Sequence, residues 1–364
     1  MNRPVLYVGI TNHGFGHATR TAAVAATIQK MCPEVLLIMT TTAPRWLLEC
    51  YMEGDFIHRP RAYDLGVVQT DSLNMDKAAT LEKLQVIQKD KNSIIASEVN
   101  FIHQNRVQLI LADIPFLAAD IATAADIPCW MVSNFGWDFI YRDWGNEFIP
   151  IADSISESYS KCDRLWRLPF HEPMSAFPNI TDIGLTGGDP KFSPEEIMSE
   201  WGISTPIEKT VLLTFGGLGL QQIPYHNLSS FPDWQFITFD RSAPELPNLL
   251  KVKDRKCRPV DFMPLCSRVI SKPGFGTFAE ATKLDIPIVS VTRKDFAEAD
   301  FLLKGITNYN SHQILTPEEF FQSDWEFLKR SPQSPRYKEP IDKNGNETIA
   351  QAVIHYLNKD ISHQ

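Results

Sequence analysis

Two glycine-rich stretches place groups that can handle protons and phosphates between a strand-like run and a helix-like run. NHGFGHATR (12–20) carries His17 at the start of a predicted helix, and SKPGFGTFAEA (271–281) carries Lys272 with Glu280 further in. Imidazole is a general base near neutral pH, whereas an ammonium group and the amides of a helix N-terminus favour anions. The two stretches therefore predict proton transfer at one loop and phosphate binding at the other.

His17 is interpreted as a general base that is oriented by a carboxylate. Asp113, in LILADIPFLAADIA, ends a neighbouring predicted strand and is its natural partner, because such a carboxylate fixes the imidazole tautomer. Two plainer interpretations stay open: His17 packs against the sheet at a helix start, and Asp113 caps the following helix. The stretch is not a dinucleotide fingerprint, since Thr19 stands where Gly or Ala is required.

The loop around Lys272 is predicted to bind a phosphate. Its glycines let the backbone approach a ligand, and a threonine there can cap the helix or donate to a phosphate oxygen. Glu280 could accept hydrogen bonds from a vicinal diol such as that of ribose. The alternative is an ordinary strand–helix turn in which Glu280 supports the helix dipole. With the second glycine-rich strand end, TFGGLGLQ, the predicted binding set is Gly216, Gly217, Lys272, Gly274, Gly276, Thr277 and Glu280.

Apolar runs alternate with helix-like runs along most of the chain. Continuous apolar runs such as VLYVGI and VQLILAD are typical of strands in a parallel sheet that is covered on both faces. We therefore predict an α/β protein with two doubly wound Rossmann-like domains that face a cleft, and a ligand at the carboxyl ends of the strands. The expected parts are a first domain with the His17 loop (1–180), a linker (181–207), a second domain with the Lys272 loop (208–345), and a C-terminal helix with its tail (346–364).

Composition excludes some classes of function. The net charge of −9 argues against nucleic acid as a partner, because phosphate backbones require a basic face. The six cysteines contain no C-x-x-C pair, which is typical of reduced thiols in the cytoplasm. The sequence shows neither a signal peptide nor a run of roughly 20 apolar residues. We expect a cytoplasmic protein without a transmembrane segment, and peripheral membrane contact stays open.

Together these motifs resemble the GT-B fold of nucleotide-sugar-dependent glycosyltransferases. The chain is similar to the inverting group that includes plant small-molecule glucosyltransferases and the bacterial enzyme that makes the lipid-linked peptidoglycan precursor. It also resembles the glycosyltransferase-like N-terminal region of L-arabinokinase-type proteins at NHGFGHATR, SNFGWDFIY and KPGFGTFAEA. The likeness spans essentially the whole chain.

The resemblance assigns roles in a donor site. In the plant enzymes the donor motif is His-Cys-Gly-Trp-Asn-Ser-x-x-Glu. Lys272 stands at the position of its His, a diphosphate contact, and Gly274 at that of its Gly. Gly276 and Thr277 fall at the phosphate-binding Asn-Ser positions, and Glu280 falls on the Glu that binds ribose.

The resemblance also implies a stereochemical course. Retaining GT-B enzymes carry Glu-x7-Glu, and Lys272 occupies the place of the first Glu, which favours inversion. His17 resembles the catalytic base of the family and Asp113 its partner. Of the Asp-Gln pair that holds sugar hydroxyls, Glu298 is the best match, but Ala299 replaces the Gln, so the usual glucose preference does not carry over. No metal is expected, since a lysine and helix amides supply the positive charge.

Further residues are candidates for the same sites. SNFGWDFIYRDW follows a predicted strand, so Asn134, Trp137 and Asp138 could line an acceptor site, although aromatic residues are more often part of the core. In the enzymes that the chain resembles, the segment corresponding to CRPVDFMPL contacts the base by backbone atoms, which makes Phe262 a candidate stacking face. Arg293 is a candidate contact for donor phosphate or sugar, or else part of a solvated loop.

The leading hypothesis is an inverting, metal-independent glycosyltransferase. It would move a sugar from a nucleotide diphosphate sugar, UDP-sugar favoured, to a hydroxyl group of a small-molecule or lipid acceptor. The nucleotide sugar is a co-substrate, so no cofactor is expected. Two alternatives stay open: a non-hydrolysing nucleotide-sugar epimerase, which should show more carboxylates, and a non-catalytic nucleotide-sugar-binding protein.

Overall fold

The computed structural model describes residues 3–69, 74–216 and 223–363. Contacts between residues divide the chain into two compact units, and each is described by itself. The first unit includes the carboxyl end of the chain as well as the amino-terminal half. Its segments are Met1–Gln69, Met75–Gly187 and Asp342–Gln364, and the second unit consists of Thr70–Asn74 and Gly188–Ile341.

The first unit is built on a seven-stranded sheet in the order β3-β2-β1-β4-β5-β6-β7. All of its strand pairs are parallel. Every residue of β1 and β4 is buried, in agreement with their continuous apolar sequences, so the predicted doubly wound sheet is confirmed. The strands are β1 (Val5–Ile10), β2 (Leu36–Thr40), β3 (Ile57–Arg59), β4 (Leu109–Asp113), β5 (Cys129–Ser133), β6 (Arg164–Arg167) and β7 (Ile180–Asp182).

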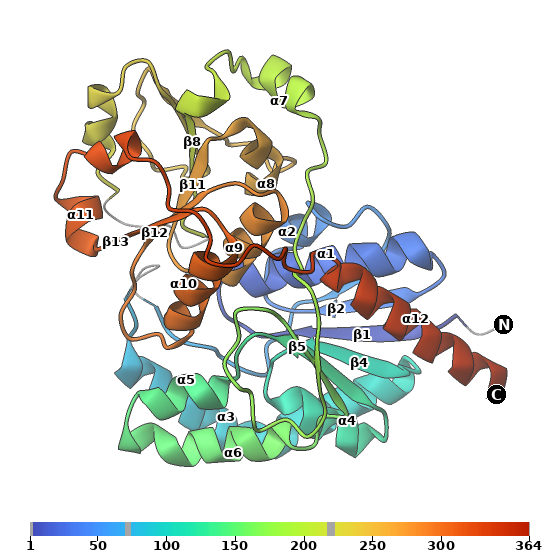
Figure 1. The fold of residues 1–364 in the computed structure, drawn as a ribbon. Helices are drawn as coiled ribbons and strands as arrows, with labels where there is room; N and C mark the ends of the chain where they lie inside the picture. The colour runs from blue at the N-terminus through green and yellow to red at the C-terminus, as the bar shows by residue number, and fades with distance from the viewer. Residues whose placement is uncertain (1–2, 70–73, 217–222, 364) are drawn as a thin grey trace. The chain divides into compact units, whose positions relative to one another are not determined.

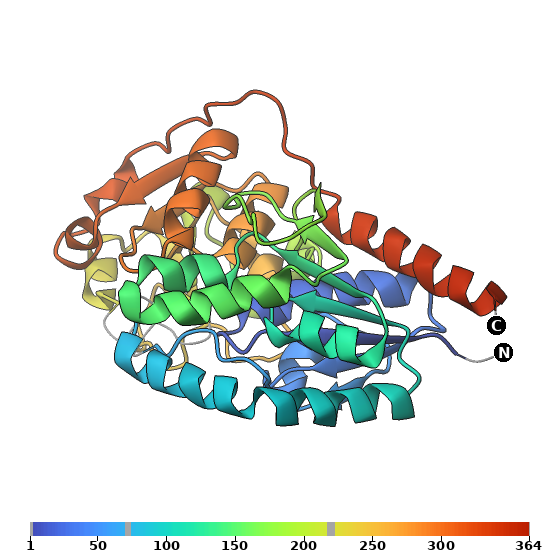
Figure 2. The same cartoon turned by 90° about the horizontal axis from the view of Figure 1, so that it is seen from below.

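Helices cover both faces of this sheet. In Figure 1, α1 and α12 lie on one face and α3, α4 and α6 on the other, and Figure 2 views the unit from the α3 side. α12 contacts α1 and buries four apolar side chains: Ile349, Ala350, Val353 and Leu357. The helices are α1 (Gly16–Met31), α2 (Arg45–Glu49), α3 (Lys77–Gln104), α4 (Leu117–Ala125), α5 (Trp137–Asp143), α6 (Ile149–Tyr159) and α12 (Gly345–His363), with a 3-10 turn η1 (Asn146–Phe148).

The second unit is a six-stranded parallel sheet in the order β10-β9-β8-β11-β12-β13. One of its faces packs against the aromatic residues of the 320s, among them Phe320 and Trp325. The strands are β8 (Thr210–Leu213), β9 (Gln235–Thr238), β10 (Leu249–Lys251), β11 (Arg268–Ser271), β12 (Ile288–Val291) and β13 (His312–Leu315). The helices are α7 (Pro194–Trp201), α8 (Pro259–Phe262), α9 (Phe275–Lys283), α10 (Glu298–Tyr309) and α11 (Pro317–Phe321), with 3-10 turns η2 (Ile207–Lys209), η3 (Tyr225–Ser230), η4 (Met263–Leu265) and η5 (Glu326–Lys329).

Each sheet has one point at which its strand order reverses. The reversal lies between β1 and β4 in the first unit and between β8 and β11 in the second. In open α/β sheets, ligands bind beyond the carboxyl ends of the strands at this point. The loop that leads to His17 follows β1 and the loop that carries Lys272 follows β11, so each lies at the switch point of its own sheet.

The chain leaves the first unit between Gly187 and Gly188, inside the stretch 181–207. Asn346 of α12 holds Gly187 on both sides: its side chain donates to the Gly187 carbonyl at 2.8 Å and accepts from the Gly187 N–H at 3.3 Å. Gly187 has a φ of 148°, a conformation that favours glycine. The C-terminal helix thus belongs to the first unit and fixes the last peptide before the second.

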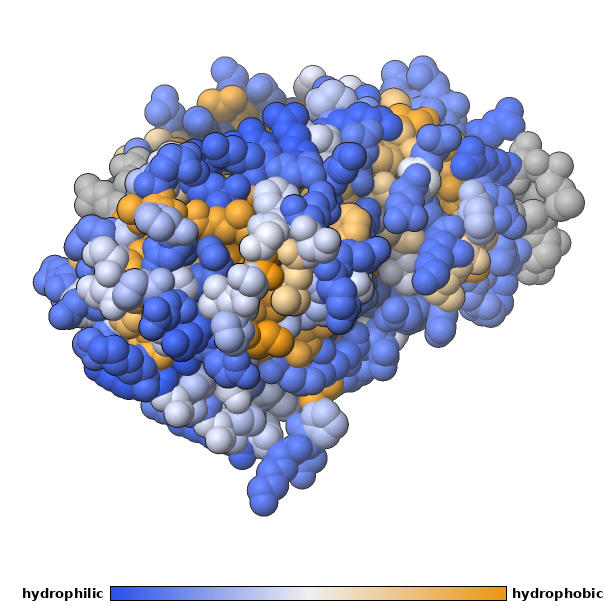
Figure 3. Space-filling view, turned by 90° about the horizontal axis from the view of Figure 1, so that it is seen from above, coloured by the Kyte–Doolittle hydropathy of each residue, from blue (hydrophilic) through white to orange (hydrophobic). Residues whose placement is uncertain are grey.

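Hydrophilic residues predominate on the face shown in Figure 3, and apolar residues lie in small groups between them. Within the residues that the structure describes, no helix is both long enough and apolar enough to cross a membrane. The longest, α3, has 28 residues but carries charged side chains along its whole length.

Candidate functional site

The β1–α1 loop and the end of β4 meet at the first switch point. Asp113 is the last residue of β4 and pairs in register with Ile10, the last residue of β1. The backbone N–H of Thr11 donates to the Asp113 carbonyl at 3.1 Å. α1 begins at Gly16, so His17 lies in its first turn, at the end of the loop whose first residue, Thr11, is bonded to Asp113.

His17 and Asp113 form a buried pair. His17 Nδ1 lies 2.8 Å from Asp113 Oδ1, and the two residues are 7% and 2% exposed. With its proton on Nδ1, the imidazole donates to the carboxylate and keeps a lone pair on Nε2. Nε2 makes no hydrogen bond to any residue in the described ranges. A general base needs this arrangement.

Arg20 extends this pair to a triad, which the sequence analysis missed. Its Nε and Nη2 donate to the two Asp113 carboxylate oxygens at 2.6 and 2.5 Å, and Nη2 also lies 3.1 Å from His17 Nδ1. Arg20 Nη1 donates to Asn134 Oδ1 at 3.0 Å. A signal was available, because residues three apart in a helix share a face, as His17 and Arg20 do.

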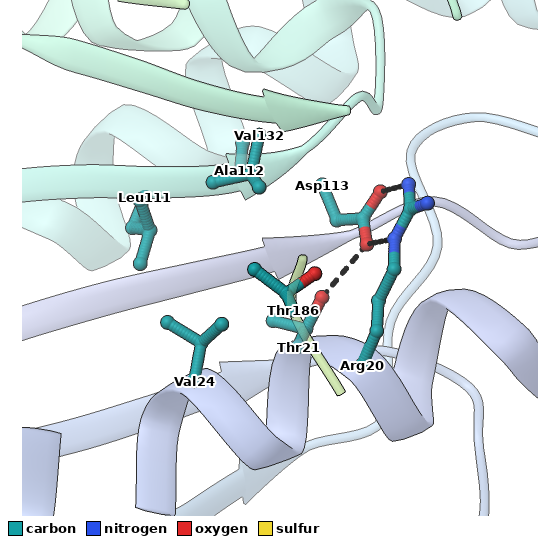
Figure 4. A pocket seen from close by; sticks show the side chains of 8 residues that line it. All are labelled: Arg20, Thr21, Val24, Leu111, Ala112, Asp113, Val132 and Thr186. Carbon is teal, nitrogen blue, oxygen red and sulfur yellow. Dashed lines mark hydrogen bonds and ion pairs between the residues drawn. The ribbon is translucent and has the colours of Figure 1, made fainter. Parts of the chain in front are cut away.

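Asp113 is held in its ionised form. Besides His17 and Arg20, the hydroxyl of Thr21 donates to it at 2.8 Å (Figure 4). Burial alone would raise the pKa of Asp113, but its interactions with Arg20 first and with His17 second hold it well below its usual range. The carboxylate therefore carries its charge throughout the physiological pH range.

The turn after Asp113 has a strained backbone. Ile114 has a φ of 45°, a left-handed conformation that β-branched residues rarely adopt. Its carbonyl accepts a hydrogen bond from the Tyr159 hydroxyl at 3.1 Å. The hydroxyl oxygen of Tyr159 in turn accepts one from the backbone N–H of Trp137 at 3.3 Å. Such strain persists where the surrounding structure enforces it, often at functional sites. Tyr159 thus ties the turn after β4 to the start of α5.

Aromatic rings surround His17. The ring centroids of Phe135, Trp137 and His13 lie 5.8, 6.2 and 5.9 Å from that of His17. The indole N–H of Trp137 is itself satisfied by Thr11 Oγ1 at 2.9 Å. These rings exclude water and lower the local dielectric constant, which strengthens the interaction between the charges of Arg20 and Asp113.

Asp64 is a second buried carboxylate beneath the same loop, and sequence reasoning did not find it. It accepts hydrogen bonds from the Thr11 hydroxyl and, at 2.8 Å, from the Asn12 N–H. Burial raises the pKa of Asp64 to about 7, although these hydrogen bonds oppose the shift. Asp64 fixes the beginning of the glycine-rich loop, and no sequence motif around Asp64 predicts that role.

The residues predicted for an acceptor site follow β5 but are largely enclosed. Asn134 and Trp137 are both 0% exposed, and Asn134 is bound to Arg20. Both pack against the triad, and their role in an acceptor site stays a prediction. Asp138 is half-buried and accepts a hydrogen bond from Ser156 Oγ at 2.9 Å, and its acceptor role stays a prediction.

In the second unit, the structure brings Gly216 and Lys272 together. They follow β8 and β11, which are paired neighbours, and a Cβ atom added to Gly216 would lie 3.7 Å from Lys272 Cε. Gly216 has a φ of 79°, a conformation that favours glycine. Gly217, predicted for the same binding set, lies outside the described residues.

The N-terminus of α9 forms the rest of this second site. The helix begins at Phe275 with Gly274 in the N-cap position, where no side chain caps it among the described residues. Of the two roles open to Thr277, the cap position is taken by Gly274, since Thr277 is the third residue of the helix, and a contact with phosphate stays a prediction. A Cβ atom at Gly274 would have only the Lys272 carbonyl nearby, at 3.9 Å, and Gly276 is half-buried. The first amides of α9 are thus placed to bind an anion.

Glu280 lies on α9 and is buried, with an exposure of 7%. Its Oε1 accepts the backbone N–H of Gly188 at 3.0 Å. Burial raises the pKa of Glu280 to about 7, although this hydrogen bond and the charges of Arg258 and Lys283 oppose the shift. The carboxylate predicted to hold a ribose therefore already binds the first residue of the second unit.

The remaining donor candidates differ in how far they are enclosed. Phe262 is 0% exposed, and its ring lies 5.8 Å from that of Trp201, so it packs in the core, and its role as a stacking face for a base stays a prediction. Arg293 lies with its guanidinium 4.3 Å from the Phe296 ring. Glu298 is the first residue of α10 and is 7% exposed. Ligand contacts of Arg293 and Glu298 stay predictions.

A small cavity borders Asp113. It has room for about one water molecule and none for a sugar. Thr186 Oγ1 is buried beside it without a hydrogen-bond partner in the described part of the chain. Figure 4 shows the lining side chains: Arg20, Thr21, Val24, Leu111, Ala112, Asp113, Val132 and Thr186.

No family model matches the chain. Over 354 residues it is 31% identical to an L-arabinokinase of Arabidopsis thaliana, a match that covers 94% of this chain and 33% of the relative. The chain thus spans about a third of the length of this relative, and the predicted resemblance to L-arabinokinase-type proteins is confirmed.

Solved glycosyltransferase structures share the fold. Arabidopsis thaliana UGT89C1, solved with quercetin, has a TM-score of 0.62 at 11% identity and covers 100% of this chain and 99% of its own. Os79 of O. sativa, solved with U2F and a trichothecene, has a TM-score of 0.60 at 14% identity, with coverages of 97% and 94%. The spinosyn forosaminyltransferase SpnP has a TM-score of 0.59 at 13% identity, with coverages of 98% and 95%. The predicted GT-B fold is confirmed.

Proposed function

We propose that the chain is an inverting glycosyltransferase that transfers a sugar from a nucleotide diphosphate sugar to a hydroxyl group. His17 is the general base and Asp113 orients it. The single observation that carries the proposal is the 2.8 Å contact between His17 Nδ1 and Asp113 Oδ1 at a sheet switch point, in a chain with the GT-B fold. That contact supports a lone pair on Nε2, the atom that would take the acceptor proton.

The proposed reaction is a single displacement at the anomeric carbon. Nε2 of His17 takes the proton of the acceptor hydroxyl while its oxygen attacks the anomeric carbon of the donor sugar. The bond between that carbon and the diphosphate oxygen breaks, and the configuration inverts. The diphosphate leaves with the bonding pair, and Lys272 and the first amides of α9 stabilise its charge.

UDP-sugar is the favoured donor. The fold neighbours include a Phytolacca americana enzyme solved with UDP-2fluoro-glucose and a Medicago truncatula enzyme solved with UDP-glucose. Glu280 is proposed to accept the ribose hydroxyls, with Arg293 and Glu298 near the phosphate or sugar. The name of the Arabidopsis relative adds L-arabinose to the acceptors, and UDP-arabinose to the donors, that a screen should contain.

Donor binding and turnover can be tested in separate steps. Thermal-shift screening against UDP-, GDP-, ADP- and dTDP-sugars should identify one nucleotide that stabilises the chain, because a ligand that binds the folded state raises its melting temperature. Mass spectrometry of a metabolite pool incubated with that donor should then show an acceptor whose mass has grown by one sugar. Stabilisation by none of the nucleotides would rule out the donor assignment.

Two variants assign the residues. His17→Ala should abolish transfer while donor stabilisation stays unchanged, with His13→Ala as the control for a neighbouring ring. Lys272→Ala should weaken donor binding and slow transfer together, whereas Lys294→Ala, on an exposed position, should leave both unchanged. Donor binding with no product from any acceptor would favour the non-catalytic alternative instead.

A further inference from the structure

We propose that Arg20 is a positioning residue that keeps His17 neutral, with its proton on Nδ1, by neutralising the Asp113 carboxylate that both residues share. The inference deepens the proposed function, since it rests on His17 as the base of that reaction. It concerns a ground-state property of the ring, which can be measured without any substrate.

Charge counting supports the proposal. With His17 neutral, the ion pair of Arg20 and Asp113 sums to zero, and these three residues are only 7%, 3% and 2% exposed, in the order His17, Arg20, Asp113. A proton added to His17 would leave this buried group with a net positive charge. In a pair of His17 and Asp113 alone, the same proton would cancel a negative charge. Because uncompensated buried charge is costly, Arg20 reverses the effect of protonation.

Hydrogen-bond chemistry selects the tautomer. A guanidinium only donates and a carboxylate only accepts. His17 Nδ1 lies 2.8 Å from Asp113 Oδ1 and 3.1 Å from Arg20 Nη2. Arg20 Nη2 already donates to Asp113 Oδ1 at 2.5 Å and to Ser133 Oγ at 3.2 Å. Its donors are therefore satisfied without the imidazole, and the Nδ1 proton belongs between His17 and Asp113.

The other groups near the ring are His13, two aromatic residues and the buried carboxylate of Asp64. His13 is titratable and lies 5.9 Å from His17 between ring centroids, and Phe135 and Trp137 are uncharged. Asp64 acts electrostatically on Asp113 and is tied to Thr11 and Asn12. Among the described residues, Arg20 and Asp113 are the charged groups that contact His17 directly.

The test is an NMR titration of the full chain labelled with ¹⁵N-histidine, in which the His17→Gln variant identifies the His17 signals. The wild-type ring should be neutral with its proton on Nδ1 at pH 7. The neutral variants Arg20→Met and Arg20→Gln should raise the titration midpoint of His17 by at least about one pH unit. Arg20→Lys keeps the positive charge but not the two parallel hydrogen bonds to Asp113, and His17 in this variant should titrate near the wild-type midpoint. Asp113→Asn should move it to lower pH.

Several results would overturn the proposal. Equal midpoints in the wild type and a folded neutral variant would show that Arg20 serves packing alone. A wild-type ring that is doubly protonated at pH 7, or that carries its proton on Nε2, would do so even if no neutral variant folds. Arg142→Met is the matched control, since Arg142 is an exposed arginine paired with Asp153, and it should shift nothing. Absence of transferase activity would contradict the proposed function and leave these outcomes intact.

Discussion

Gly188 donates its backbone N–H to the carboxylate of Glu280 at 3.0 Å, while the neighbouring peptide group of Gly187 is held by Asn346. The first residue of the second unit is thus bound by the side chain that the resemblance assigns to ribose. A donor that engages Glu280 would act on the residue at which the chain crosses between the units. This relationship leads to the first prediction.

Glu280→Gln should make stability less dependent on pH. The pKa of Glu280 is raised to about 7 in the folded state, from 4.5. Its contribution to stability is complete below about pH 4.5 and is lost as pH rises through about 7. The amide avoids that loss and can still accept the Gly188 N–H. The variant should therefore gain on the order of 2 kcal/mol relative to wild type between pH 5 and pH 8.

Urea unfolding at the two pH values measures this difference. Glu339→Gln, at an exposed position, should show no such dependence. A gain for Glu280→Gln that is the same at pH 5 and pH 8 would contradict the prediction. If Glu280 also binds the donor's ribose, the variant's affinity for the nucleotide sugar should fall as its stability rises.

Gly274→Ala should preserve the fold and weaken anion binding. A Cβ atom at this position has only ordinary contact with the Lys272 carbonyl, at 3.9 Å. The added methyl group would nevertheless stand at the amides that begin α9, where the diphosphate is proposed to lie. The free energy of unfolding, measured by thermal denaturation, should stay within about 1 kcal/mol of the wild-type value. Calorimetry should show that the affinity for the donor is reduced at least about tenfold. An unchanged affinity would place the diphosphate elsewhere.

Asn346→Ala should destabilise the first unit. The side chain makes two hydrogen bonds to the buried peptide groups of Gly187, at 2.8 and 3.3 Å. Their loss should cost about 1–3 kcal/mol, because two hydrogen bonds to buried peptide groups are removed. Asn358→Ala, at an exposed position on the same helix, is the matched control. Equal denaturant midpoints for the two variants would show that Asn346 is dispensable.

Asp113→Ala should be among the most destabilising single changes. It leaves the buried guanidinium of Arg20 without its ion pair, a loss of about 3–5 kcal/mol. Asp153→Ala, which breaks an exposed pair with Arg142, should cost less than about 1 kcal/mol. Because the folded-state pKa of Asp113 is lowered, its contribution is present above pH 3.8 and is lost as pH falls. The difference in unfolding free energy between the wild type and the variant, measured by denaturant unfolding, should therefore narrow as pH falls below 3.8.

The fold could be predicted because its strands carry a strong local signal. Runs such as VLYVGI and VQLILAD are apolar throughout, and only a sheet covered on both faces buries them fully. The contact between His17 and Asp113 followed from the same reasoning, since β1 and β4 are neighbours at the switch point. Topology thus brought together two residues that are far apart in the sequence.

Side-chain direction at the strand ends could not be predicted. Asn134 and Trp137 follow β5 as an exposed acceptor surface would, yet tertiary packing turns them inward against Arg20 and Thr11. The burial of Phe262 could not be predicted for the same reason, because α7 packs against the short helix α8 that carries it. Arg20 was missed because what a long side chain reaches depends on neighbours from other strands.

The placement of α12 bears on how the chain is made. Its buried residues Ile349, Ala350, Val353 and Leu357 pack in the amino-terminal unit, against a helix synthesised more than three hundred residues earlier. Domains fold as the ribosome releases them. The amino-terminal unit therefore keeps the apolar surface that α12 covers exposed until the second unit has also been synthesised. A nascent chain stalled before Asp342 would expose that surface to chaperones, and a version rearranged to begin at Asp342 would shorten the wait.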